Sequence, residues 1–469
     1  MSGEPVALRL ARFTSGLTLE QVPAEVRAKA RRSILDAAGV AWAASATPAA
    51  KETACGVLST SGAGDVPVFG LGLRLPPADA ALLNGVLIHS LEYDDTYLPG
   101  AVHPTASLLP VVLSATHLER RSGADLLCAY IAGLEAMARL GQYGGVRLRE
   151  AGLHPTSVLG VFGCALAAAR LMRLSPAEAA MAQGIALSMA SGTVGHAAEG
   201  AVNKRLHPGL AAQGGIRAAA MARAGLKGPA LPYEGARGLF RFFDDGPSRT
   251  AALHDLVDDL GVRWAAGELS LKPIPACHLT HGCADAAARL RRAHAFDIDQ
   301  VRKVTARVPA GIVREVCEPL EVKRRPVSGY AAQFSLPYIV AAALVRGQFG
   351  FDELDDAATS DPSILALASR VEYEVDPDST YPRHRPGEVI VEFRDGTAIR
   401  HREAVNRGCP DRPLSDGEVN AKFRANAARA GLEHLAAAVL ETVAAMDENP
   451  DGAALVETLT AGRREGGYQ

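Results

Sequence analysis

The sequence contains few aromatic residues, no excess of basic residues and no long apolar run, and each absence excludes a class of protein. Only 5% of its 469 residues are aromatic, although 48% are hydrophobic. The apolar residues are therefore mainly Ala, Leu and Val, and this composition, with 46 Gly, favours closely packed helices over an aromatic-rich β-sandwich. The formal net charge of −3 offers no electrostatic basis for binding nucleic acid. No uninterrupted apolar run approaches the ~18 residues that a membrane-spanning helix needs.

The cysteines show neither an even number nor a regular spacing. They are Cys55, Cys128, Cys164, Cys277, Cys283, Cys317 and Cys409, and no C-x-x-C motif occurs. This argues against a secreted disulfide framework and against a four-cysteine zinc or iron–sulfur site. The first five residues also lack the basic segment that begins a secretory signal. We therefore expect a reduced, soluble, cytoplasmic protein without a nucleic-acid or membrane partner.

The length predicts two domains, and the hydrophobic pattern changes along the chain. Apolar residues recur at helical spacing up to about residue 260, with helices expected over 23–45, 76–93, 104–118, 123–140, 158–171 and 176–189. Strands are then expected over 301–308, 371–375, 389–393 and 398–401, with helices over 282–294 and 330–346. Helices return over 415–430 and 432–446. The predicted fold class is mainly α: one large all-helical domain from residues 1–264 and 409–469, and a smaller α+β domain from 265–408. Ligands favour clefts at such boundaries.

Three histidines, His103, His154 and His207, each stand directly before a proline and open an Ala/Gly-rich segment. Because proline favours the first helical position, each histidine is expected near a helix N-cap. Histidine is not a preferred cap, so local stability does not explain its choice. Helix N-termini attract anions, and imidazole titrates near neutral pH. We interpret the three ends as one site for a small polycarboxylate; the alternative is that they only mark helix starts.

An acidic cluster, Glu92, Asp94 and Asp95, follows His89 and precedes Thr96. If the preceding helix continues to Thr96, then His89, Glu92 and Thr96 share one face. Three carboxylates at a helix C-terminus oppose the macrodipole. We therefore expect cations, caps or a substrate-facing role to offset them; the alternative is a solvated acidic helix end.

Two basic segments complete the set of candidate residues. Lys204 and Arg205 come just before His207 and predict a strong anion site, with a basic surface loop as the alternative.

The second segment begins at Lys272 and contains Cys277, His278, His281 and Cys283. These are zinc-ligand types, but the cysteine spacing is not a standard one, and the side chains would diverge around a helix. We favour a helix packed on the cleft, with Lys272 and one histidine, His278, facing substrate.

These residues together resemble the MmgE/PrpD family, which includes 2-methylcitrate dehydratase, cis-aconitate decarboxylase and iminodisuccinate epimerase. The resemblance runs through nearly the whole chain, and its order and spacing are specific. It is carried by residues 89–96 with 103–104, 152–156 with 160–163, 204–209, 271–275, 334–338, 408–410 with 413–415, and 422–423.

The resemblance implies an all-helical domain built from both ends of the chain, a smaller α+β lid, a homodimer, and neither a metal nor an organic cofactor. The pocket residues of the family's decarboxylase match Thr96, His103, His154, Lys204 and Lys272. Two features depart from the family pattern: Glu92 stands where Asp is usual, and the loop between Thr96 and His103 is one residue longer than in the decarboxylase.

The sequence thus predicts a metal-independent enzyme that acts on a small di- or tricarboxylate. Cations and helix N-termini stabilise the negative charge that develops beside a substrate carboxylate. We expect His103 and His154 to form the acid/base pair, and Glu92, Asp94 or Asp95 to orient an imidazole or act as a base, with Thr96 beside them. Substrate carboxylates would bind at Lys204, Arg205, His207, Lys272 and His278.

The type of reaction is left open among three outcomes. By family frequency the first is a hydro-lyase reaction, the dehydration of a 2-methylcitrate- or citrate-type substrate. Epimerisation or isomerisation of an iminodisuccinate-like compound comes next, followed by cis-aconitate-type decarboxylation. A hypothesis of another class is a non-catalytic helical scaffold, against which the presence of all the carboxylate-binding residues argues.

Overall fold

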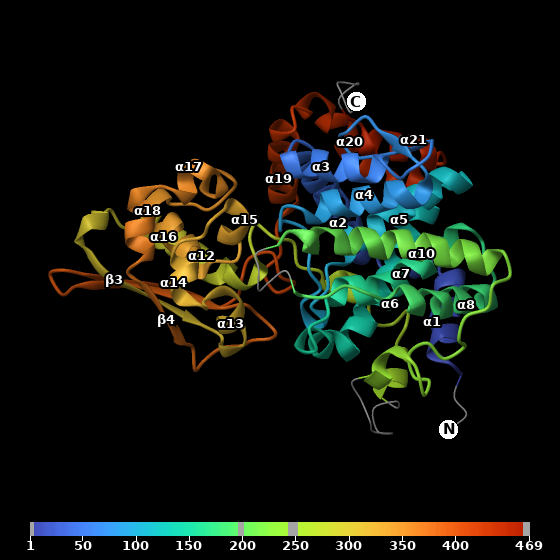
Figure 1. Cartoon of the computed structure of the whole chain (residues 1–469), viewed down its shortest axis with the longest axis horizontal. Helices are drawn as coiled ribbons and strands as arrows, with labels where there is room; N and C mark the ends of the chain where they lie inside the picture. The colour runs from blue at the N-terminus through green and yellow to red at the C-terminus, as the bar shows by residue number, and fades with distance from the viewer. Residues whose placement is uncertain (1–3, 196–200, 243–251, 463–469) are drawn as a thin grey trace. The chain divides into compact units, whose positions relative to one another are not determined.

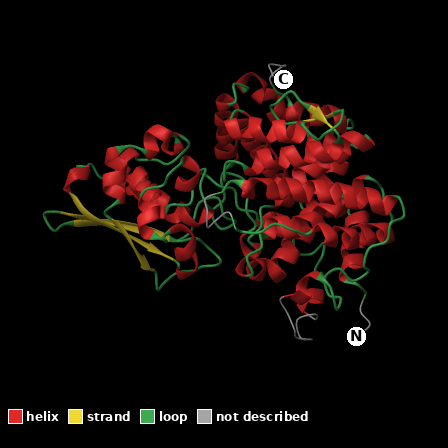
Figure 2. Ribbon diagram, viewed as in Figure 1, coloured by secondary structure: helices red, strands yellow, loops and turns green. Residues whose placement is uncertain are grey.

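Helices dominate the computed structural model, which describes residues 4–195, 201–242 and 252–462 (Figures 1 and 2). Within these ranges the strands form one sheet of four and one of two. The predicted mainly α fold with a smaller α+β part is confirmed. The chain divides into two compact units. The first takes the described residues of Met1–His196, Asn203–Leu271 and Ser415–Gln469, and the second those of Ala197–Val202 and Lys272–Leu414. Whether these units are domains with the boundaries predicted above stays a prediction.

The first unit is helical and is built from both ends of the chain. Its helices are α1 (Val6–Gly16), α2 (Ala24–Ser45), α3 (Pro48–Leu58), α4 (Pro77–His89), α5 (Pro104–Glu119), α6 (Gly123–Glu150), α7 (Pro155–Leu171), α8 (Pro176–Ala186), α10 (His207–Arg223), α19 (Asp416–Arg429), α20 (Ala436–Ala444) and α21 (Gly452–Thr460). The unit also contains a short antiparallel pair, β1 (Val66–Pro67) and β2 (Arg74–Leu75). None of the described helices is long and apolar enough to span a membrane.

Helices α4, α5, α7 and α10 pack on one another at the centre of this unit (Figure 1). The contact between α4 and α10 depends on the absence of a side chain at Gly85. A Cβ atom there would lie 2.6 Å from the Cα atom of Gly209, which is closer than real Cβ contacts allow. The two backbones can therefore approach closely. This packing brings the C-terminus of α4 to the N-terminal end of α10.

Several predicted helices have different limits in the structure. Helix α4 ends at His89 rather than at residue 93, so the acidic cluster is not helical. Helix α6 continues ten residues past the predicted end, to Glu150, through a glycine-rich stretch that has low intrinsic helix propensity. The predicted helix 330–346 is two helices, α15 (Gly329–Ala332) and α16 (Leu336–Arg346), because the Ser335 side chain caps the second by accepting a hydrogen bond from the Tyr338 N–H.

The second unit contains a mixed sheet with the strand order β4-β3-β5-β6. Strand β3 (Val301–Val308) pairs parallel with β4 (Val371–Val375) and antiparallel with β5 (Gly387–Phe393), which pairs with β6 (Ala398–Glu403). The helices are α12 (His281–Ala293), α13 (Val313–Val316), α14 (Leu320–Arg324), α15, α16, α17 (Asp356–Thr359) and α18 (Pro362–Ala368). Alternate strand residues, among them Val304 and Val389, are buried in a core that includes apolar residues of α12 and α16. Each strand that the sequence predicts for this unit is present in the structure.

Candidate functional site

Four imidazoles gather where four helices of the first unit begin or end. His89 is the last residue of α4, His103 and His154 are the N-caps of α5 and α7, and His207 is the first residue of α10. The ring centroids of His103 and His154 lie 6.5 Å apart, and those of His154 and His207 lie 5.0 Å apart. His89 lies 4.9 Å from His103 and 5.9 Å from His154 by the same measure. The three His-Pro helix starts therefore converge, as the hypothesis of one shared site requires.

The acidic cluster forms a buried loop beside these imidazoles rather than one face of a helix. The prediction that His89, Glu92 and Thr96 share a helical face is therefore wrong. Glu92 adopts a left-handed backbone conformation with φ of 50°, which ends any continuation of α4. Glu92, Asp94 and Asp95 are all at most 2% exposed. This burial contradicts the alternative of a solvated acidic helix end.

Asp94 lies between two histidines. Its Oδ2 atom is 2.7 Å from Nδ1 of His89 and 3.5 Å from Nδ1 of His103. Both Asp94 and the His89 side chain are fully buried, whereas the His103 side chain is 13% exposed. A carboxylate near an imidazole favours its protonated form. Asp94 can therefore orient both histidines and stabilise positive charge on His103.

The main chain determines which nitrogen of His103 carries a proton. The Nδ1 atom lies 2.8 Å from the carbonyl oxygen of Asp95, and Thr96 Oγ1 lies 3.4 Å from the same nitrogen. Because a carbonyl oxygen only accepts hydrogen bonds, Nδ1 is the donor. The His103 main-chain N–H donates to Oγ1 of Thr156 at 3.1 Å, which ties the start of α5 to the first turn of α7. Nδ1 of His103 is thus engaged with the main chain, which points to Nε2 as the nitrogen that could exchange a proton with a substrate.

The Asp95 carboxyl group holds the first turn of α5. It accepts a hydrogen bond from the Thr105 N–H at 3.2 Å and another from the Thr105 hydroxyl. Burial raises the pKa of Asp95 to about 7, and the charge of Asp94 adds to the increase while the Thr105 hydrogen bonds oppose it. Asp95 thus orients His103 through its carbonyl oxygen, while its side chain supports the helix start.

His154 and His207 form a hydrogen-bonded imidazole pair. Their Nδ1 atoms lie 2.9 Å apart, so one ring donates and the other accepts. Burial lowers the pKa of His154 well below its usual value, and the positive charge of Lys204 and the neighbouring histidines lower it further. His154 is therefore neutral at neutral pH.

The predicted anion-binding segment supplies a buried ammonium group. Lys204 lies in the short 3-10 turn Asn203–Leu206 just before α10, and its Nζ atom forms an ion pair with Oε1 of Glu92. The two side chains are 9% and 3% exposed. Lys204 is therefore not part of a basic surface loop. Arg205, in the same turn, is half-buried.

The C-terminal part of the chain supports the acidic loop from behind. Lys422 of α19 donates to the carbonyl oxygen of Tyr93 at 2.8 Å and lies 2.7 Å from Oδ1 of Asp36 in α2. Its ammonium is also 3.6 Å from the centre of the Tyr93 ring. Burial raises the pKa of Asp36, and Lys422 opposes that increase. The geometry of the loop therefore depends on residues separated by more than 300 positions in sequence.

Two predicted substrate-binding residues, Lys272 and His278, belong to the second unit. Within that unit Nε2 of His278 lies 3.2 Å from Nδ2 of Asn406, and its ring lies 4.7 Å from that of His281. Nε2 of His281 lies 3.1 Å from the Ala276 carbonyl oxygen. Their part in binding substrate stays a prediction.

One group of described side chains has the composition and spacing of a metal site. His89, Asp94 and His103 each offer one ligand atom, and these atoms lie within 4.8 Å of one another. Asp94 Oδ2 is, however, already hydrogen-bonded to His89. The expectation of a metal-independent protein stays a prediction, which a chelation experiment can test.

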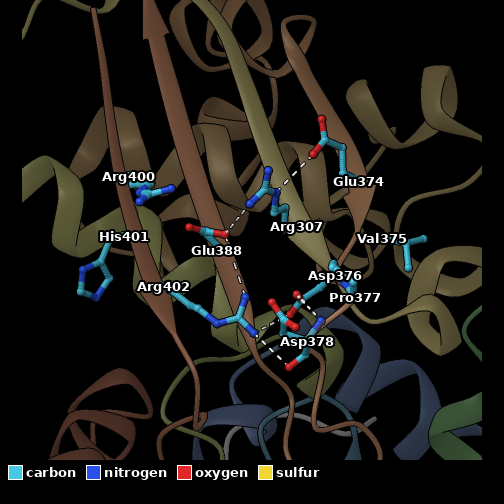
Figure 3. A pocket seen from close by; sticks show the side chains of 10 residues that line it. All are labelled: Arg307, Glu374, Val375, Asp376, Pro377, Asp378, Glu388, Arg400, His401 and Arg402. Carbon is cyan, nitrogen blue, oxygen red and sulfur yellow. Dashed lines mark hydrogen bonds and ion pairs between the residues drawn. The ribbon is translucent and has the colours of Figure 1, made fainter.

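A cavity of about 770 Å³ lies on the outer face of the sheet in the second unit and has a different character. Figure 3 shows Arg307 between Glu374 and Glu388, with Arg402 next in the row. Arg307 is 3.2 Å from Glu374 and 3.3 Å from Glu388, and Arg402 is 2.7 Å from Asp376. These charges neutralise one another across neighbouring strands, and none of the predicted site residues lines the cavity. It is therefore a poor candidate for the polycarboxylate site.

Comparison with known families agrees with this geometry. The model of the MmgE/PrpD N-terminal domain matches residues 8–251, and that of the MmgE/PrpD C-terminal domain matches residues 274–448. The chain belongs to the MmgE/PrpD family. The N-terminal match covers the residues of the first unit that carry all four clustered imidazoles, and the resemblance drawn from the sequence is confirmed.

Individual MmgE/PrpD relatives match over most of the chain. A cis-aconitate decarboxylase of Homo sapiens is 32% identical over 379 residues, which cover 76% of this chain and 74% of the human protein. That of Mus musculus is 29% identical over 95% of this chain and 91% of the mouse protein. A cis-aconitate decarboxylase of Aspergillus terreus is 28% identical over 97% of this chain and 96% of its own length.

Two residues of this candidate site were not among the predicted site residues. His89 was considered only as part of a helical face, although a histidine in an apolar helix five residues before Asp94 is a detectable signal. Lys422 belonged to a stretch that carries the family resemblance, but its contacts with Tyr93 and Asp36 could not be read from the sequence. His89 contacts the buried carboxylate of Asp94, and Lys422 contacts that of Asp36. Neither residue belongs to a recognisable sequence motif.

Proposed function

We propose that the chain is a lyase that removes carbon dioxide from a cis-aconitate-type unsaturated tricarboxylate, without a metal or an organic cofactor. The observation that carries this proposal is a pair of imidazoles in opposite electrostatic environments. His103 lies beside the Asp94 carboxylate, whereas burial and the charge of Lys204 lower the pKa of His154. The similarity to proteins named cis-aconitate decarboxylases favours this reaction over the dehydration that the sequence analysis ranked first.

The chemistry requires one proton donor and at least one cation. Loss of carbon dioxide breaks a carbon–carbon bond and leaves its electron pair on the substrate. In an unsaturated tricarboxylate, that pair moves through the double bond to a carbon beside another carboxylate. A proton added there completes the reaction, which yields carbon dioxide and a dicarboxylate with a shifted double bond. A fixed cation at the second carboxylate stabilises the developing charge more in the transition state than in the ground state.

His103 is the proton donor in this proposal. Its Nδ1–H is held by the Asp95 carbonyl oxygen, and the Asp94 carboxylate favours the imidazolium form. The proposal assigns the proton transfer to substrate to the Nε2–H of that imidazolium. His154, being neutral, serves as a hydrogen-bonding partner for a substrate carboxylate rather than as the acid.

Lys204 is the cation that we assign to a substrate carboxylate. It is paired with Glu92, so the substrate must share or displace that carboxylate. The family usually has the shorter Asp at this position, and Glu92 therefore offers a physical basis for a difference in substrate preference. We extend the proposal to Arg205, His207, Lys272 and His278 as further carboxylate-binding residues. We also propose a cytoplasmic homodimer, which sedimentation velocity would test.

The decisive experiment offers cis-aconitate, citrate, 2-methylcitrate and iminodisuccinate to the full-length protein in D₂O and follows each by NMR. Decarboxylation gives a dicarboxylate with one deuterium at the protonated carbon. Dehydration gives a new double bond without loss of carbon dioxide, and epimerisation gives deuterium exchange without a smaller product. Decarboxylation of cis-aconitate supports the proposal. Dehydration, epimerisation or no turnover in the panel refutes it.

Variants then test the roles. We expect His103→Ala to lower kcat by about 10²- to 10⁴-fold, the usual contribution of a positioned proton donor. Exposed His434, in the same unit, gives the matched control His434→Ala. If His103→Ala stays within a few-fold of the control, His103 is not the proton donor.

A further inference from the structure

We infer that His89 is a positioning residue that shares the Asp94 carboxylate with His103 and thereby limits how strongly that carboxylate acts on the proton donor. This inference rests on the proposed function, because it concerns the same reaction. His89 was not among the expected catalytic or binding residues. Its role follows from its contacts and its burial.

The geometry links His89 to His103 through one oxygen atom. Oδ2 of Asp94 is 2.7 Å from Nδ1 of His89 and 3.5 Å from Nδ1 of His103. A carboxylate accepts and does not donate when it is ionised, so Nδ1 of His89 carries the proton of the shorter contact. Asp94 therefore interacts more strongly with His89, which is fully buried, than with His103.

His89 is placed behind the imidazoles that could reach a substrate. Its side chain is fully buried, whereas that of His103 is 13% exposed. Its ring is stacked on that of His154, with an angle of 29° between the planes. Its Nε2 atom has no hydrogen-bond partner among the described residues. A proton donor needs access to the reacting atoms, so His89 acts through Asp94 and not on the substrate.

The charges around His103 define the direction of the effect. Asp94, Asp95 and Thr96 face it from the acidic loop, His89 from α4 and His154 from α7. The Lys204–Glu92 pair lies beyond, where Lys204 acts on His154. Of these groups, Asp94 is the one whose carboxylate lies against Nδ1 of both His89 and His103. Without the His89 donor, the full charge of Asp94 acts on His103 and strengthens its hold on the proton.

The test compares two substitutions of His89. Asparagine keeps an N–H donor close to the position of Nδ1, whereas phenylalanine fills the space without one. We expect the alkaline limb of the kcat profile of His89→Phe to move about one pH unit upward, a typical effect of a nearby opposite charge. The kcat at neutral pH should fall about tenfold, because a more basic donor transfers its proton less readily. His89→Asn should stay within about threefold of wild type, with KM little changed in both variants.

A second readout does not depend on turnover. The His103 imidazole is titrated by NMR in protein labelled with ¹⁵N-histidine, with its signal assigned from His103→Asn. An upward shift of the His103 titration in His89→Phe but not in His89→Asn supports the inference, even if no substrate in the panel is turned over and the proposed function fails. A His103 titration that is equal in wild type, His89→Phe and His89→Asn overturns it.

Substitution of Asp94 keeps the inference testable if His89→Phe does not fold. In Asp94→Asn, the link between the two histidines has lost its charge. We expect the His103 titration to fall below that of wild type. The donor-removing change His89→Leu should raise the His103 titration in the wild-type background and leave it where Asp94→Asn put it in the Asp94→Asn background. If His89→Leu moves the titration equally with and without the Asp94 charge, His89 does not act through Asp94, and the inference is wrong.

Discussion

Replacing Lys204 by methionine would remove a buried cation while keeping an unbranched side chain in its place. The Glu92 carboxylate, only 3% exposed, would lose its ammonium partner. Removing one member of a buried pair typically costs about 3–5 kcal/mol of stability. The carboxyl group can also respond by taking up a proton. Protonation at pH 7 of a carboxyl group whose usual pKa is ~4.3 costs about 1.4 kcal/mol for each pH unit between the two values. The loss of stability caused by the unpaired Glu92 charge at pH 7 therefore cannot exceed about 4 kcal/mol.

This limit predicts a characteristic pH dependence for Lys204→Met. As the pH falls from 7 to 5, protonation of Glu92 becomes easier, and the penalty should shrink by about 1.4 kcal/mol per pH unit. A loss of packing alone would not depend on pH in this way. The difference in unfolding free energy between wild type and variant should therefore be largest at neutral pH.

Tryptophan fluorescence in urea is the appropriate assay, because both tryptophans, Trp42 and Trp264, lie in the first unit with the ion pair. Exposed Lys227 supplies the matched control Lys227→Met, expected within about 0.5 kcal/mol of wild type. The double variant Lys204→Met/Glu92→Gln should recover part of the loss, since it removes both charges. A loss below 1 kcal/mol at pH 7 for Lys204→Met, or an equal loss at pH 5 and pH 7, would refute the reasoning.

Three further predictions concern packing, titration and metal dependence. Gly85→Ala should destabilise the first unit by about 1–3 kcal/mol, because its Cβ would press on the backbone of α10. The control is Gly56→Ala, whose Cβ meets nothing within 4 Å. Equal urea midpoints for the two variants would contradict the packing argument. The Asp95 carboxyl, with a pKa of about 7 against 3.8 ordinarily, holds a proton in the native state that the unfolded chain releases between these values. Wild type should therefore lose stability relative to Asp95→Asn as the pH rises from 4 to 7, by up to about 1.4 kcal/mol per unit; parallel pH profiles would show that Asp95 does not titrate in this range. Dialysis against EDTA should leave the proposed decarboxylase activity unchanged, and a loss that zinc restores would instead make the group of His89, Asp94 and His103 a metal site.

The sequence alone predicted those features that depend on local chemistry. Proline at the first helical position marked the starts of α5 and α7, because its fixed backbone angle suits that position wherever it occurs. Alternation of apolar residues marked the strands of the second unit for the same local reason. The candidate residues His103, His154 and Lys204 could be selected because titratable and cationic groups at helix starts are unusual without a ligand or a partner.

The contacts that organise the site were decided by tertiary structure. No residue between His89 and Thr96 is a glycine or proline, so nothing local predicted that α4 ends at His89. The chain turns there because Glu92 meets Lys204, 112 residues away, and Asp94 folds back onto His89. Charges buried together interact strongly because water no longer screens them, and which charges are buried together depends on the packing of α4, α5, α7 and α10. The sequence therefore determined the chemical groups and the helices that carry them, while the packing decided which groups are partners.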